Sequence, residues 1–126
     1  MSAINLILTS FVSACFVITG MISLIQPERI LNYLGCESFS RNGKNEVRAV
    51  YGGLRIGIGL LLLATVSMPG IRTGIFLTVG IVLLGTILGR VISVLLDGSP
   101  TTPTWIITAL ESFQSGILVF VLNSTH

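Results

Sequence analysis

The stretch NEVRAVYGGLRIGIGLLLL, residues 45–63, decides the fold of this chain. Most of it is as apolar as a membrane-spanning helix, yet it carries Glu46, Arg48 and Arg55. A charged side chain at the centre of a bilayer costs about 3 kcal/mol, so charges persist in a span only where they are paired, hydrated or face a cavity. The stretch therefore predicts a membrane helix with one polar side.

The composition of the whole chain also predicts a membrane protein. Of its 126 residues, 52% are hydrophobic and 10% are charged, whereas a soluble domain is about 25% charged. A membrane span needs about 20 apolar residues, so the chain has room for four spans and no separate soluble domain. The net charge of +2 is small and the seven basic residues are scattered. This distribution gives no support to a nucleic-acid partner.

Four apolar runs predict one all-α integral membrane domain over residues 1–126. The predicted spans cover about residues 4–25, 46–67, 73–96 and 104–122. The segment PERILNYLG, between the first two spans, begins with a proline and ends with a glycine, which is typical of a short helix. We therefore expect a four-transmembrane-helix bundle with a short interfacial helix between helices 1 and 2.

Two turns set the expected limits of the second span. Asn45 is a natural N-cap, which would place Glu46 in the first turn, where the helix dipole favours a negative charge. The dipeptide Pro69-Gly70 is typical of the tight turn that ends a span. The second span is therefore expected to run antiparallel to the third.

Basic residues predict the orientation in the membrane. Arg29, Arg41 and Lys44 lie between the first two spans, and Arg72 alone lies between the second and third. Because cytoplasmic loops carry an excess of Lys and Arg, we expect loop 26–45 to be cytoplasmic and both termini to lie outside.

Small and weakly polar residues predict the faces along which the helices pack. At 100° per residue, one stripe of the first span should face the bundle, and it consists of Asn5, Thr9, Ser13, Phe16, Gly20 and Ser23. In the second span, Arg48, Tyr51, Gly52, Arg55 and Gly59 share one arc, while Glu46, Gly53, Gly57 and Ala64 form the opposite face. We therefore expect this helix to be the central one. The expected packing glycines are Gly52, Gly53, Gly57, Gly59, Gly85 and Gly89.

The last two spans each carry one polar stripe. These stripes are Thr86, Arg90, Ser93 and Asp97 in the third span, and Thr104, Thr108, Glu111 and Ser115 in the fourth. By helical rise, Arg55, Arg90 and Glu111 reach similar depths from the same membrane side. We expect these three to meet in the cytoplasmic half, with Arg48, Tyr51 and Asp97 at the entrance. An anion, a carbonyl-bearing ligand or another carboxylate could balance two positive charges against one negative.

The sequence supplies no catalytic residues, metal ligands or cofactor motif. It contains no HExxH, no glycine-rich phosphate loop and no CxxC, and its histidine is His126. Cys15 and Cys36 are expected to be unpaired thiols. No cofactor and no metal are expected.

Three functions fit these residues. The first is a module in the lipid bilayer that binds or passes a small anionic or oxygen-rich amphiphile. The second is an accessory or assembly protein, a homo-oligomer or part of a larger membrane complex, in which the charges form a structural ion-pair network. The third, with least support, is a membrane-embedded enzyme that uses Glu111 or Asp97 as acid or base.

The motif E-x-R-A-x-Y-G-G, residues 46–53, resembles the Domain of Unknown Function 4345 family. Gly57-Ile58-Gly59, Gly89-Arg90, Asp97-Gly98 and a glutamate early in the last helix extend this resemblance over nearly the whole chain. The resemblance implies a small four-helix membrane protein, located in the bacterial inner membrane. It implies no catalytic role for any residue, because the family has no established activity.

Overall fold

The computed structural model describes residues 2–36 and 39–124, and over these residues the chain is helical. The elements are α1 (Ala3–Ile25), α2 (Pro27–Tyr33), α3 (Arg41–Glu46), the π-helix η1 (Val47–Gly53), α4 (Leu54–Ser67), α5 (Pro69–Asp97) and α6 (Thr102–Ser124). Four continuous helical segments are long and apolar enough to cross a membrane: Ala3–Ile25, Arg41–Ser67, Pro69–Asp97 and Thr102–Ser124. These four segments contain all four predicted spans.

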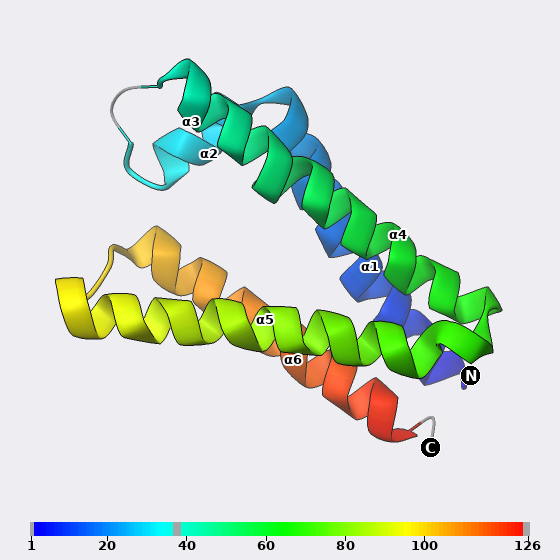
Figure 1. The fold of residues 1–126 in the computed structure, drawn as a ribbon. Helices are drawn as coiled ribbons and strands as arrows, with labels where there is room; N and C mark the ends of the chain where they lie inside the picture. Colours follow the sequence, from blue (N-terminus) through cyan, green and yellow to red (C-terminus); the bar gives the residue numbers. More distant parts are fainter. Residues whose placement is uncertain (1, 37–38, 125–126) are drawn as a thin grey trace.

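The long helices are arranged as two pairs (Figure 1). One pair is α1 with η1 and α4, and the other is α5 with α6. Contacts of α4 with α5, and of α1 with α6, join the pairs. The pairs meet near the two chain ends and the α4–α5 turn, and they separate toward the end that carries α2 and α3 (Figure 1).

The second long helix begins earlier than the sequence predicts. Its N-cap is Ser40, whose hydroxyl accepts a hydrogen bond of 2.8 Å from the amide of Gly43. Asn45 therefore lies inside α3, and Glu46 is the last residue of α3 instead of a first-turn residue. The predicted cap at Asn45 was wrong because an earlier hydroxyl satisfies the free amides of the first turn.

The third long helix also begins earlier than predicted. Met68 makes the turn, with φ −126° and ψ 77°, and Pro69 opens α5. Proline fits the first helical turn because its missing N–H has no partner there in any helix. The expected Pro69-Gly70 turn was therefore wrong, and the dipeptide belongs to the helix.

Glycines bring α1 into close contact with η1 and α4. A Cβ built on Gly20 would lie 2.8 Å from the carbonyl oxygen of Gly52, and one on Gly59 would lie 2.9 Å from the carbonyl oxygen of Ser13. The Ser13 hydroxyl donates to the carbonyl of Gly59 across 2.6 Å. These helices therefore pack backbone to backbone, as small residues allow in lipid.

The predicted stripe of α1 is confirmed. Its buried residues are Asn5, Thr9, Val12, Ser13, Phe16, Gly20 and Ser23. Beside this stripe lies an apolar core, which contains Val12, Phe16, Leu62, Phe76, Val79, Leu83, Ile117, Leu118 and Val121. All four long helices contribute to this core.

Other glycines have no close neighbour in the described chain. A Cβ on Gly57, Gly85 or Gly89 would have no described atom within 4 Å apart from nearby residues of its own helix. One on Gly53 would meet only the carbonyl oxygen of Arg48, at 3.8 Å. The described chain does not show the predicted packing at these four residues, and their packing against another chain stays a prediction. The second long helix is also not central, because it packs mainly on α1 and α5, while α6 packs on α1 and α5.

Candidate functional site

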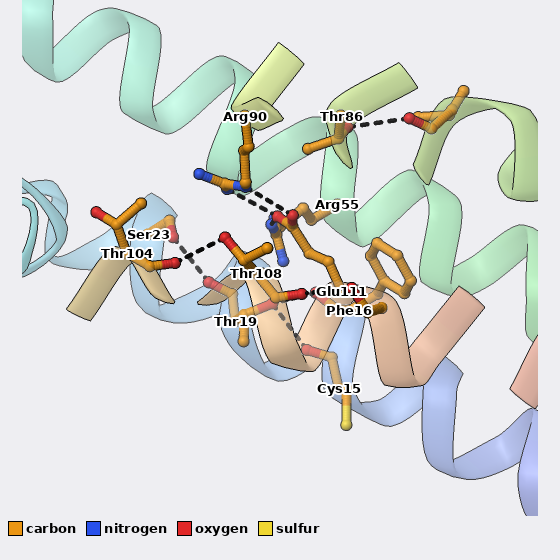
Figure 2. Close-up of polar contacts among 12 residues, drawn as sticks. Cys15, Phe16, Thr19, Ser23, Arg55, Thr86, Arg90, Thr104, Thr108 and Glu111 are labelled. Carbon is orange, nitrogen blue, oxygen red and sulfur yellow. Dashed lines mark hydrogen bonds and ion pairs between the residues drawn. The ribbon is translucent and has the colours of Figure 1, made fainter. Parts of the chain in front are cut away.

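Three charged side chains from three helices meet, as the sequence predicts (Figure 2). Arg90 of α5 binds Glu111 of α6 through two hydrogen bonds, Nε to Oε2 at 2.8 Å and Nη2 to Oε1 at 2.9 Å. Nη2 of Arg55 in α4 lies 3.6 Å from Oε1 of the same carboxylate. The Glu111 side chain is 3% exposed, so the carboxylate is almost fully buried beneath two guanidinium groups.

The geometry at Glu111 is that of a strong ion pair. Two parallel N–H···O bonds from one guanidinium fix both carboxylate oxygens and are shorter and stronger than neutral hydrogen bonds. Removing one partner of a buried pair leaves an uncompensated charge, which costs about 3 to 5 kcal/mol. The Arg90–Glu111 pair therefore holds α5 and α6 in one relative position.

Arg55 is held mainly by aromatic rings. Its guanidinium carbon lies 5.7 Å from the ring centroid of Phe16 and 5.8 Å from that of Tyr51. A cation over an aromatic face gains about 0.5 to 2 kcal/mol. Phe16 belongs to α1, so Arg55 connects the charged cluster to both members of the first helix pair.

The π-helix positions Tyr51 at this cluster. In η1 the amide of Leu54 donates to the carbonyl of Ala49, five residues back, instead of four. The wider turn changes the faces predicted from a regular α-helix. Gly52 and Gly59 face α1, whereas Tyr51 and Arg55 line a cavity shared with α5 and α6. The prediction that all of these residues share one arc was therefore only partly correct, because the glycines and the polar residues face different neighbours.

A cavity of about 460 Å³ lies beside the ion pair, on the side of the α5–α6 connection. Side chains of α5 and α6 form most of its wall, and Tyr51 of η1 also lines it. Its lining residues are Tyr51, Thr86, Gly89, Arg90, Val91, Ser93, Val94, Leu95, Pro100, Thr104, Trp105 and Thr108. We call it the large cavity.

Hydroxyl groups give the large cavity its polar character. Thr86 and Thr108 donate to carbonyls of their own helices, at 3.0 Å and 2.9 Å, so their oxygen lone pairs remain free to accept. The Tyr51 hydroxyl makes no hydrogen bond within the described chain and can donate. Arg90 adds a positive charge, and the valines, Leu95 and Trp105 add apolar wall. This chemistry suits a molecule with an oxygen-rich head and an apolar body.

A second cavity of about 130 Å³ lies on the Arg55 side of the cluster, and we call it the small cavity. It is lined by Phe16, Val50, Tyr51, Leu54, Arg55, Ile58, Val82, Leu83, Thr86, Arg90 and Glu111. Tyr51, Thr86 and Arg90 line both cavities. These three side chains therefore form the boundary between the large and the small cavity.

Two predicted entrance residues lie elsewhere. Nε of Arg48 donates to the carbonyl of Leu24 across 3.1 Å, and Arg48 lines neither cavity. Asp97 is an exposed residue at the end of α5 and also lines neither cavity. Close packing of α1 on η1 keeps Arg48 at α1, and Asp97 lies about 10 Å beyond Arg90 along the helix, at 1.5 Å per residue. Of the predicted entrance, only Tyr51 lines a cavity.

The predicted ligand set contained Tyr51 but omitted the threonines of these walls and the aromatic residues Phe16 and Trp105. Thr86, Thr104 and Thr108 lie on the polar stripes of the sequence, at helical spacing from the charges. That spacing was the signal that could have placed them in the site. Nothing in the sequence indicated that Phe16 would stack on Arg55, since contacts between distant helices depend on the fold.

The described residues offer little for metal binding. No group of three or more His, Cys, Asp or Glu side chains comes together in the searched part of the chain. Cys15 and Cys36 are free thiols. His126 lies outside the described residues.

The fold and the site define a class: a helical chain with four segments able to cross a membrane and a charged cluster between them. The chain matches the family described as domain of unknown function (DUF4345) over residues 4–122, and it belongs to this family. No curated protein and no solved structure matches the chain.

Proposed function

We propose that this chain is a four-helix integral membrane protein that binds an amphiphile with an oxygen-rich head in the large cavity. The observation that carries the proposal is the lining of that cavity of about 460 Å³, in which hydroxyl groups and Arg90 stand beside apolar side chains. An amphiphile would place its head against Tyr51, Arg90 and Thr108. Its tail would leave along the exposed apolar surface of α5 and α6.

The proposed setting is a bundle in the bacterial inner membrane. Helix α2 lies at the membrane surface, and loop 26–45 and the opening of the large cavity lie on the cytoplasmic side. The excess of basic residues in that loop supports this orientation. Both termini and the α4–α5 turn then lie on the outer side.

Binding of an amphiphile is tested with Trp105, which is the one tryptophan of the chain and lines the large cavity. Purified protein in phosphatidylcholine nanodiscs is titrated with oleate, a monoacylglycerol and a short-chain ubiquinone. We expect at least one of them to change the Trp105 fluorescence with saturation and to raise the unfolding temperature, because a ligand specific for the folded state stabilises it. No saturable change with any of these probes contradicts the proposal.

A matched pair of threonine variants localises the binding. Thr108 lines the large cavity, whereas Thr78 lies on α5 outside it, and both hydroxyls donate to the carbonyl four residues back. Losing one hydrogen bond to the ligand costs about 1 kcal/mol, so Thr108→Val should weaken binding about fivefold. Thr78→Val should bind as the wild type does. Equal effects of the two variants would argue against the large cavity.

A second function, assembly, rests on a different observation. Glu111 joins α4, α5 and α6, as a purely structural ion-pair network would. In addition, a Cβ on Gly57, Gly85 or Gly89 would contact no described atom apart from nearby residues of its own helix. These glycines would then pack on another copy or on a larger complex. Native mass spectrometry from lipid tests this function. A monomer after gentle extraction argues against it.

The enzyme interpretation has the weakest geometric support. Both carboxylate oxygens of Glu111 accept hydrogen bonds from Arg90, and the side chain is 3% exposed, so the carboxylate has little access to a substrate. Asp97, the other candidate acid, lines neither cavity.

A further inference from the structure

Arg55 differs from Arg48, Arg72 and Arg90 in its hydrogen bonding. Arg90 binds a carboxylate, Arg48 binds the carbonyl of Leu24 and Arg72 binds the carbonyl of Thr65. Among the residues that the structure describes, Arg55 forms no hydrogen bond. Its contacts are two aromatic rings and a carboxylate oxygen at 3.6 Å. A guanidinium has five N–H donors, so its hydrogen-bonding capacity is largely unused.

The local charge is also unbalanced. Arg55 and Arg90 contribute two positive charges and Glu111 contributes one negative charge, which leaves one positive charge at the cluster. Arg90 has already engaged both oxygens of Glu111. The surplus charge therefore lies mainly on Arg55, whose side chain is 21% exposed.

The small cavity lies directly on this guanidinium. Its wall is apolar apart from Tyr51, Arg55, Thr86, Arg90 and Glu111, and its volume is about 130 Å³. Because a water molecule takes about 30 Å³ of the liquid, this space holds a small anion with a few waters and not a phospholipid head.

We infer that the small cavity binds a monovalent anion of the size of chloride or formate. Arg55 attracts and hydrogen-bonds the anion, and the Tyr51 and Thr86 hydroxyls lie at the same cavity wall. One negative charge brings the net charge of the cluster to zero. A divalent anion would make the net charge negative and would repel Glu111 at short range. The anion site is separate from the large cavity and extends beyond the proposed amphiphile binding.

Exchange of anions tests the site in phosphatidylcholine nanodiscs, where the lipid carries no net charge. Gluconate, which is too large for the small cavity, is replaced stepwise by chloride at constant ionic strength, and the unfolding temperature is recorded. We expect a saturating rise for the wild type, the same rise for the control variant Arg72→Gln, and no rise for Arg55→Gln. Rises of equal size in Arg55→Gln and wild type, or no saturable rise in the wild type, overturn the inference.

Two further measurements cover the case in which Arg55→Gln does not fold. The ³⁵Cl NMR line of chloride should broaden in the presence of wild-type protein, and formate but not gluconate should reverse the broadening. Glu111→Gln removes the negative charge that competes with the anion, so it should bind chloride about tenfold more tightly. An unbroadened line, or weaker chloride binding by Glu111→Gln, contradicts the anion site.

These experiments distinguish the small-anion site from binding of a lipid phosphate. They also distinguish its failure from failure of the proposed amphiphile binding. If stabilisation appears only in nanodiscs with anionic lipid and not with free chloride, the small-anion site is wrong. Thr108→Val should leave the chloride response unchanged, because Thr108 lines only the large cavity. The chloride response can therefore persist where amphiphile binding fails, and the reverse also holds.

Discussion

The two halves of this helix assembly are held together by different means. In the half near the α4–α5 turn, which we call the apolar half, Leu62, Phe76, Leu118 and their neighbours form an apolar core, which borders a cavity of about 280 Å³ with an almost wholly apolar lining. In the half toward α2 and α3, the polar half, Glu111 joins Arg55 and Arg90, and two cavities flank the cluster. The same helices α4, α5 and α6 pass through both halves (Figure 1).

The difference follows from the reach of the side chains. Apolar side chains interdigitate and bring helices to contact, since dispersion acts only at short range. An arginine and a glutamate that bind end to end can link helices across a wider gap than apolar side chains can. Charge in the polar half thus provides a link between helices and polar groups in the walls of the two cavities beside it.

The largest expected effect comes from breaking the ion pair of the polar half. Arg90→Ala should lower the free energy of unfolding in lipid by about 3 to 5 kcal/mol, because Glu111 stays buried without its two hydrogen bonds. The double variant Arg90→Met with Glu111→Leu should recover much of this loss, since it removes both charges. A single variant that loses less than about 1 kcal/mol would mean that the pair is not the main link of this half.

A smaller loss is expected from the apolar half. Leu118 is 1% exposed, and Leu118→Ala should cost about 2 to 3 kcal/mol through the cavity that it leaves. The value is at the low end for a core leucine, because lipid is as apolar as the core and the transfer from water does not contribute. Leu88→Ala, at an exposed position of α5, is the control and should change the same unfolding free energy little.

Substitution of glycines on α4 tests how far the close backbone contact between α1 and α4 contributes to stability. A Cβ at Gly59 would lie 2.6 Å from Cγ2 of Val17, so Gly59→Ala should lower the unfolding free energy by about 2 kcal/mol. At Gly57, two residues earlier, a Cβ would contact no described atom apart from nearby residues of its own helix. Gly57→Ala should therefore be neutral or stabilise the monomer by about 0.5 kcal/mol. A strong loss of oligomer in Gly57→Ala would instead support the assembly function.

The smallest effect concerns the connection between the first two long helices. A hydrogen bond from its own backbone, then one from the Lys44 ammonium 3.0 Å away, hold the pKa of the Glu28 carboxyl below its usual value of 4.5. A lowered pKa in the folded state means that this stabilisation is present above pH 4.5 and is lost as the pH falls through the lower folded-state value. Unfolding temperatures of wild type and Glu28→Gln should differ slightly at about pH 6, and the difference should shrink as the pH is lowered below 4.5; a constant difference would contradict the prediction.

Much of the fold was predictable from the sequence because lipid imposes simple rules. Apolar runs of sufficient length identify the four long helices, and small-residue periodicity identifies the buried stripe of α1. The meeting of Arg55, Arg90 and Glu111 was predictable as well, since a charge left without a partner in a membrane-crossing helix would be costly. The helix starts at Arg41 and Pro69 were missed because several residues near each boundary can cap or open a helix.

The sequence by itself determined how many helices could cross a membrane and which charges had to find partners. Both follow from local composition and from the cost of charge in lipid. The tertiary structure decided that Glu111 binds Arg90 tightly and Arg55 only loosely, that η1 turns Tyr51 toward the cluster, and that two cavities lie on either side. These features depend on distances between side chains from different helices, which helical periodicity along one segment does not contain.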